Sequence, residues 1–293
     1  MSYKITELDG LLKNFEGDID ARMKQYEAKR KKLLTKADSL KDFANGHAYY
    51  GIHKADGGWY YREWAPGAEK MYFMGEFNDW NPTSHPMKKL DHGRFEIFLE
   101  GEDALWNGCL VKAVVIHDGK QLERIPTYAT RVVQDEETTL WCAQVWDVYA
   151  DFPWQDADFH GEEVPLIYEC HIGMAQNKYG IGSYTEFRDS TLPRIKELGY
   201  NTIQIMAIME HPYYGSFGYQ VSNFFAASSR YGTPEELKSL INTAHKMGIR
   251  VLLDVVHSHA VKNTNEGLNM FDGTEYQFFH GGDKGNHSAW DTK

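Results

Sequence analysis

The apolar residues of this chain change their spacing near Pro165, and this change limits the folds that the chain can adopt. From 45 to 148, apolar and aromatic residues alternate with polar ones in short runs, separated by turn signals at 56–58, 65–67 and 91–93. Strands about ten residues apart, with turns between them, are typical of an immunoglobulin-like β-sandwich of roughly 100 residues. We therefore predict a β-sandwich over 45–148.

After Pro165 the pattern alternates between strands and helices. Nearly continuous apolar runs at 166–170, 202–208 and 250–256 predict strands, and the segments 183–198 and 233–247 between them predict helices. Strands that are apolar on both faces and alternate with helices are typical of a parallel sheet. A second domain, of α/β class, is predicted over 165–293.

Other segments of the chain are helical or connecting. Apolar residues at three- and four-residue spacing predict a helix over 6–36 within an N-terminal helical segment, 1–44, and its basic run at 29–32 suits a solvated helix end or a partner-binding patch. Thr233 as N-cap, Glu236 three residues later and Gly248 as the stop delimit the helix over 233–247. Prolines and acidic residues predict a linker over 149–164.

Composition excludes several classes of partner. The chain has 31 basic and 42 acidic residues and a net charge of −11, so it lacks the basic surplus that nucleic-acid binding requires. No apolar run approaches the roughly 20 residues of a membrane span, and the N-terminus has no signal-peptide pattern, which favours a cytoplasmic chain. Three separated cysteines, with no C-x-x-C pair among them, argue against a disulfide framework or a zinc ribbon.

The first candidate site is on the sandwich. Trp64 and Trp80 lie beside turns, with Asn78, Asp79, Asn81 and the turn at 91–94 nearby in the sequence. Exposed indole rings beside polar groups could stack on a sugar ring while the polar groups bind its hydroxyls. Alternatively, both tryptophans fill the sandwich core.

The second candidate site follows the third predicted strand of the α/β domain. Asp254, His257 and His259 lie where parallel strands place their ligands, at the carboxyl ends. His257 and His259 could be a zinc pair, although no third ligand is evident at a suitable spacing, or they could be hydrogen-bonded core residues. In a third interpretation, Asp254 and His259 face a substrate pocket together with Tyr219, from the loop after the second strand, unless that loop simply packs.

Several motifs resemble a known enzyme family. WAPGAEKMYFMGEFNDWNP, residues 64–82, resembles the starch- and glycogen-binding sandwich that precedes many α-amylase-type enzymes. DVVHSH fits the wider amylase superfamily, and EHPYYGSFGYQV, YGTPEEL and GLNMFDGT resemble the 1,4-α-glucan (glycogen) branching enzymes of eukaryotic type. The resemblance implies that 165–293 is the first part of a (β/α)8, or TIM, barrel. These 129 residues contain three predicted strands of the eight, whereas a complete barrel needs about 250 residues.

The resemblance also implies a reaction. Branching enzymes cleave an α-1,4-glucan such as glycogen, starch or amylose, hold the chain on a carboxylate and transfer it to a 6-hydroxyl with retention of configuration. Retention requires two carboxylates about 5 Å apart. No metal or organic cofactor is implied.

Individual site residues follow from the same motifs. Tyr219 is similar to the tyrosine that stacks on the transferred sugar, Asp254 to the aspartate that orders the site, and His259 to the histidine that binds the sugar's hydroxymethyl group. The expected glucan contacts of the sandwich are Trp64, Ala65, Pro66, Trp80, Asp91, His92, Gly93 and Arg94.

The chain departs from the family pattern in one respect. The family's nucleophile, acid/base and third carboxylate follow the fourth, fifth and seventh barrel strands, which lie beyond Lys293. Glu169, Glu210 and Asp254 are the strand-end acids available, and an open three-stranded sheet cannot enclose them in a pocket. We therefore expect a fragment of a branching enzyme, inactive by itself. The alternatives are a glucan-binding protein without catalysis and an amylase or debranching hydrolase.

Overall fold

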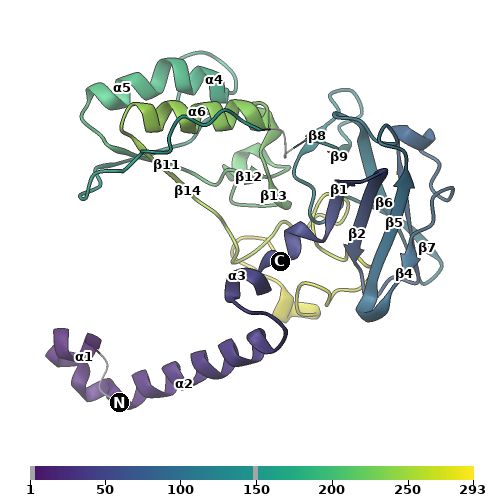
Figure 1. The fold of residues 1–293 in the computed structure, drawn as a ribbon, viewed down its shortest axis with the longest axis horizontal. Helices are drawn as coiled ribbons and strands as arrows, with labels where there is room; N and C mark the ends of the chain where they lie inside the picture. The colour runs from purple at the N-terminus through teal and green to yellow at the C-terminus, as the bar shows by residue number, and fades with distance from the viewer. Residues whose placement is uncertain (1–3, 148–150) are drawn as a thin grey trace. The chain divides into compact units, whose positions relative to one another are not determined.

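A computed structural model describes residues 4–147 and 151–293 (Figure 1). The chain divides into two units, Met1–Tyr49 and Tyr50–Lys293. Among the helices of the described residues, none is long and apolar enough to span a membrane.

The first unit is helical, but the helix predicted over 6–36 is interrupted. It consists of α1 (Lys4–Leu8), α2 (Glu16–Leu33) and α3 (Leu40–Phe43), with a 3-10 turn at Gly10–Phe15 between α1 and α2. The Asp9 carboxylate accepts a hydrogen bond from the amide of Leu11 at 2.9 Å and starts this turn, which breaks the α-helical pattern. None of the residues of α2 is buried, and the basic residues Arg30, Lys31 and Lys32 occupy its last turn.

Two antiparallel sheets confirm the predicted sandwich. One sheet has the order β1-β2-β5-β4, with β1 at Gly51–Ala55, β2 at Gly58–Trp64, β5 at Arg94–Glu100 and β4 at Lys88–Lys89. The other has the order β3-β6-β9-β8, with β3 at Lys70–Gly75, β6 at Leu110–His117, β9 at Trp141–Gln144 and β8 at Val132–Gln134, and β7 (Lys120–Arg124) pairs with β6.

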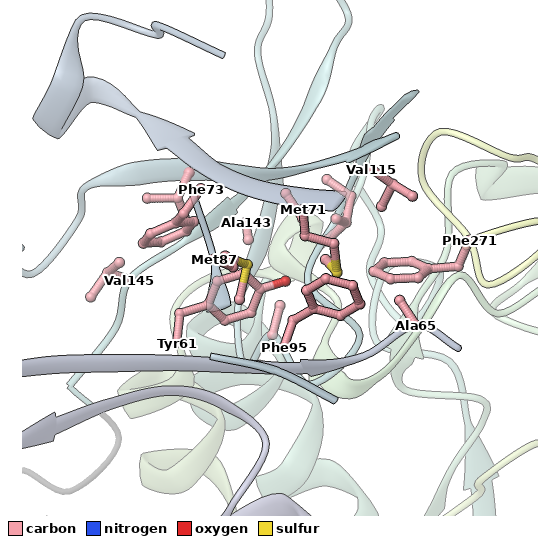
Figure 2. Packing of buried hydrophobic residues seen from close by; sticks show 14 of the residues in the cluster. Tyr61, Ala65, Met71, Phe73, Met87, Phe95, Val115, Ala143, Val145 and Phe271 are labelled. Carbon is pink, nitrogen blue, oxygen red and sulfur yellow. The ribbon is translucent and has the colours of Figure 1, made fainter. Parts of the chain in front are cut away.

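The core of the sandwich lies between the inward faces of these sheets (Figure 2). Tyr61 and Phe95 come from one sheet, and Met71 and Phe73 come from the other; all four are almost completely buried. Phe271, from the α/β part of the chain, belongs to the same cluster. The sandwich core is therefore completed by a residue that is distant in the sequence.

The α/β part contains the three predicted parallel strands, in the order β10-β11-β14. Their bounds are β10 at Ile167–Cys170, β11 at Thr202–Ile205 and β14 at Arg250–Leu253. The predicted helices are α4 (Tyr184–Glu186), which continues through one π-turn at Phe187–Thr191 into α5 (Leu192–Glu197), and α6 (Pro234–Lys246). A hairpin of β12 (Met209–Glu210) and β13 (Asn223–Ala227) is inserted after β11.

The helices bury one face of this sheet. Ile203 and Ile205 of β11 pack with Leu192, Ile195 and Leu240 of the helices, and all five are almost completely buried. By contrast, some of the apolar residues at the edge strands are exposed. These are Ile167, Leu252 and Leu253.

The segment predicted as a linker packs along helix α6. The amide of Gln155 donates to Asn242 Oδ1 at 2.9 Å, and His245 Nδ1 lies 2.7 Å from Asp156 Oδ2. The ring of Phe159 stacks on His245 at 4.2 Å. The described part of this segment is therefore attached to the helix, and the predicted boundary at 148–149 falls among residues 148–150, outside the described residues.

Candidate functional site

Tyr219, Asp254 and His259 lie together at the carboxyl ends of β11 and β14. Asp254 comes directly after β14, and its amide donates to Ile205 O at 2.9 Å, which holds it beside the end of β11. The hydroxyl of Tyr219 donates to Asp254 Oδ2 at 2.9 Å. The loop that carries Tyr219 therefore returns to the strand that carries Asp254.

His259 attaches to the same loop through its backbone. Its Nε2 lies 2.7 Å from the carbonyl oxygen of Tyr219, and because a carbonyl only accepts, Nε2 carries the proton. Nδ1 lies 2.8 Å from the hydroxyl of Ser258, and the ring lies 4.9 Å from the ring of Trp290. In the neutral imidazole, Nδ1 is then an acceptor.

Burial and a neighbouring charge keep Tyr219 protonated. Its removal from water, followed by the hydrogen bond and the negative charge of Asp254, raises the pKa of the phenol to about 12. At neutral pH, Tyr219 is therefore a hydrogen-bond donor. Gly218 precedes it at φ +88°, in close contact with the carbonyl of Ala207, a conformation that other residues rarely adopt.

His257, the other histidine of the DVVHSH motif, lines a neighbouring hollow. His257 lies 5.8 Å from the ring of Phe224, and both line a hollow of about 720 Å³ that also contacts His259 and Phe278. In the described part of the chain, no group of three or more His, Cys, Asp or Glu side chains could hold a metal ion. A zinc site at His257 and His259 thus lacks a third ligand here.

The acids at the strand ends have different surroundings. Glu210 is completely buried, and its carboxylate accepts hydrogen bonds from the His211 amide at 3.1 Å, the Ser228 hydroxyl at 3.1 Å, and the Ser229 amide and hydroxyl at 2.7 and 2.8 Å. Burial raises its pKa. Glu169 is exposed on β10. Glu210 is thus a structural acid that organises the loop around it, a role that the sequence pattern did not indicate.

Two buried histidines were not predicted. His211 Nδ1 donates to Met209 O at 3.0 Å, while its Nε2 has no hydrogen-bond partner. His171 lies 3.2 Å from the Tyr231 hydroxyl through Nε2, and its Nδ1 is also without a partner. Burial lowers the pKa of both rings, that of His211 to about 4. His171 directly follows β10 and His211 directly follows β12, and these positions at strand ends were the available signal in the sequence.

On the sandwich, the structure brings the Trp64 turn and the 91–94 turn together. The indole N–H of Trp64 donates to His92 O at 3.0 Å, and the Ala65 amide donates to Gly93 O at 2.9 Å. Gly93 has φ +75°, and a Cβ there would lie 2.5 Å from the Cα of Pro66. Arg94 Nε donates to Asp91 O at 3.1 Å and closes the second turn.

Trp80 lies apart from this pair of turns. Trp64 is the last residue of β2, whereas Trp80 follows β3 of the other sheet and its amide donates to Gly75 O at 2.9 Å. Trp80 is 37% exposed and has φ +58°. The Asn78 side chain beside it bonds to Phe73 O and Asn81 O and so stabilises its turn. The two tryptophans therefore occupy two different positions of the sandwich, with Trp64 partly buried and Trp80 exposed.

Family models match both parts of the chain. Residues 49–129 match carbohydrate-binding module 48, the isoamylase N-terminal domain, and residues 180–285 match the alpha amylase catalytic domain. The fold is similar to a putative alpha amylase from Salmonella typhimurium, with a TM-score of 0.64 and 23% identity over 83% of this chain and 38% of that chain. It is also similar to a pullulanase from Bacillus acidopullulyticus, with a TM-score of 0.63 and 20% identity over 83% of this chain and 34% of that chain. The fold is thus a carbohydrate-binding module followed by part of an alpha-amylase-type barrel.

Sequence comparison with curated proteins gives more similar relatives within this class of amylase-type proteins. The chain is 46% identical to a 1,4-alpha-glucan-branching enzyme of Felis catus, over 99% of this chain and 42% of the relative. It is 43% identical to one of Dictyostelium discoideum, over 99% of this chain and 44% of the relative. The chain is therefore similar over nearly its whole length to 1,4-alpha-glucan-branching enzymes, and it spans about two fifths of the length of these relatives.

Proposed function

We propose that this chain is part of a 1,4-α-glucan branching enzyme. Such an enzyme cleaves α-1,4-linked glucan and transfers the cut segment to a 6-hydroxyl. The observation that carries the proposal is the cluster of Tyr219, Asp254 and His259 at the carboxyl ends of adjacent barrel strands, in a chain 46% identical to a branching enzyme. Residues 45–148 are the proposed glucan-binding module, 149–164 the linker and 165–293 the start of the barrel. The proposed setting is the cytoplasm.

Each residue of the cluster has a proposed part in binding the sugar. The Tyr219 ring stacks on the transferred glucose, and its hydroxyl is held by Asp254, which orders the site. His259, with Nε2 bonded to Tyr219 O, orients the loop, and its Nδ1 accepts from the sugar's hydroxymethyl group in place of the Ser258 hydroxyl. These residues bind and orient the substrate.

The bond-making carboxylates are proposed to come from later barrel strands. A retaining mechanism needs two carboxylates about 5 Å apart, one on each side of the bond. Glu210 cannot be one of them because four hydrogen bonds hold its carboxylate inside the protein. We therefore expect the 293 residues alone to form no new branches.

The test of the reaction uses the native protein isolated from its source cells. Incubated with amylose, it should create α-1,6 linkages, counted after debranching with isoamylase, without a proportional rise in reducing ends. A matching rise in reducing ends would identify a hydrolase. If the native protein has the 33.7 kDa mass of this chain and changes neither quantity, a glucan-binding protein remains.

The sandwich is proposed to bind glucan through Trp64 and the 91–94 turn. Replacing Trp64 with Ala should weaken glycogen binding about tenfold, close to the upper value of a single aromatic stacking contact. Trp106→Ala is the matched control, because Trp106 is an exposed tryptophan of the sandwich outside the proposed site. Affinity electrophoresis in glycogen measures both variants, and Trp80→Ala tests the second tryptophan position separately.

Retained binding in Trp64→Ala, with normal thermal unfolding, would return Trp64 to a structural role. An equal loss in Trp106→Ala would show that the assay reports folding rather than the site.

A further inference from the structure

The motif GLNMFDGT, residues 267–274, does not lie in the Tyr219 cluster but enters the sandwich. Phe271 is completely buried, and its ring points in among Ala65, Met71, Phe95 and Val115 of the sandwich core (Figure 2). It follows β14 in the sequence, so a barrel loop supplies this core residue.

Polar groups on both sides hold the inserted ring in place. Arg124 is almost completely buried, and its guanidinium donates to Met270 O at 2.9 Å and to Phe271 O at 3.1 Å. The Asp272 carboxylate accepts from the Gly67 amide at 2.7 Å and from the amide and hydroxyl of Thr274 at 2.9 and 2.6 Å. The bonds of Arg124 and of the Gly67 amide therefore join the loop to the sandwich, while the Asp272–Thr274 bonds fix the turn of the loop itself.

At the insertion, two glycines pack too closely against their neighbours to accept a side chain. A Cβ on Gly67 would lie 2.6 Å from Thr274 Cγ2, and a Cβ on Gly273, at φ +92°, would overlap the ring of His117. His117 Nδ1 lies 2.8 Å from Gly67 O and donates to it. Side chains at either glycine would push the two parts of the chain apart.

The segment after the insertion contacts the proposed glucan-binding tryptophan. Gln277 Nε2 donates to Trp64 O at 2.6 Å, while its Oε1 accepts from the Asp272 amide at 2.9 Å. The ring of Phe278 meets the Trp64 ring edge-on at 5.8 Å. The same segment continues along the hollow of about 720 Å³ that His259 also lines.

We propose that residues 270–278, here named the latch, couple glucan binding at Trp64 to the barrel loop beside His259. This inference rests on the proposed glucan binding by the sandwich. When a glucan binds to Trp64, the Trp64 carbonyl stays bonded to Gln277 and its ring stays against Phe278. Fixing the position of Trp64 therefore also orders the latch and the segment that follows it. Because coupling between two sites is reciprocal, occupancy of the barrel site stabilises the Trp64 turn in return.

Hydrogen–deuterium exchange of the 293-residue chain, with and without maltoheptaose, tests the coupling. In the wild type, maltoheptaose should slow exchange at 62–66 and 91–94 and also at 276–287. In Phe271→Ala the sandwich peptides should still be protected while the protection at 276–287 is lost. Phe98→Ala is the matched control, because Phe98 is a half-exposed phenylalanine of the sandwich that packs on Tyr60 outside the latch.

A second variant covers the case in which Phe271→Ala fails to fold. Arg124→Met keeps an apolar stem of similar length and removes the hydrogen bonds to Met270 O and Phe271 O, so it should also uncouple the two regions. Val132→Ala, a sandwich core change outside the latch, shows whether lower stability alone removes the coupling.

The outcomes separate this inference from the proposed function. Protection confined to 62–66 and 91–94 in the wild type would overturn the latch and leave glucan binding by the sandwich intact. Protection at 276–287 that persists in both latch variants would show direct sugar contact and would also overturn it. Without protection anywhere, the sandwich does not bind this glucan, and both proposals fail.

Discussion

Glu63 and Glu210 are carboxylates buried away from water, and each is surrounded by hydrogen-bond donors. Glu63 accepts from the Tyr61 hydroxyl, the Trp64 amide, and the amide and hydroxyl of Thr127, at 2.5 to 3.1 Å. Burial raises the pKa of both carboxyls despite these bonds. At single residues, then, buried hydrogen-bonded carboxyls order the loops next to both candidate sites, because Glu63 precedes Trp64 and Glu210 precedes the Tyr219 loop.

The lowered pKa of His211 predicts that the free energy of unfolding falls in acid. Burial and the charges of Arg230 and His171 keep its folded pKa near 4, against about 6.5 when unfolded. Between these values the unfolded state binds a proton that the folded state does not, so stability falls as the pH drops from 6.5 to 4. One site contributes up to about 3 kcal/mol over this range.

Urea unfolding from pH 7.5 to 4.5 measures this dependence, with His211→Gln as the comparison. The carboxyls with raised pKa act in the opposite direction, but they are present in both proteins and cancel in the difference. The variant should lose less stability on acidification. Equal slopes in the two proteins would rule out His211 as the titrating group.

At the level of elements, local signals determined helix ends better than strand ends. Helix α6 begins at Pro234 after Thr233, as predicted, and Gly248 follows its end at φ +74°. The apolar run at 202–208 forms a strand only over Thr202–Ile205. The bounds of a strand depend on its partners, and β10 and β14 end opposite Ile205.

Thr233→Ala tests the capping of α6. The Thr233 hydroxyl accepts from the Glu236 amide at 3.3 Å, and the Glu236 carboxylate accepts from the Thr233 amide at 2.7 Å. Losing the first bond should cost about 1 kcal/mol of unfolding free energy. Thermal and urea unfolding measure it, and Thr83→Ala, in a turn of the sandwich, should change stability by less than half as much.

At the scale of the whole second unit, β10 and β14 have no further strand partner in the parallel sheet among the described residues, and they carry exposed apolar side chains. Leu253 of β14 is 43% exposed, and Val255 just beyond it is 51% exposed. An apolar edge strand is a template for pairing with another chain. We expect these 293 residues to self-associate through β14.

Leu253→Lys should reduce this association, because a charge on an edge strand opposes pairing. Light scattering at increasing concentration measures the effect, with circular dichroism to confirm an unchanged fold. Leu140→Lys is the control, since Leu140 is an exposed leucine on the sandwich. If both lysine variants reduce scattering equally, net charge rather than the edge is responsible.

The sequence by itself determined the sandwich, the parallel strands and the caps of α6, and it predicted that Asp254 and His259 follow the carboxyl end of a parallel strand. Each of these follows from spacing within a segment, or from the rule that the ends of parallel strands share one edge. Only the tertiary structure placed Phe271 in the sandwich core, enclosed Glu210 within its four donors and brought the Tyr219 hydroxyl to Asp254. Those outcomes depend on which surfaces meet after the chain has folded, and no local spacing encodes that choice.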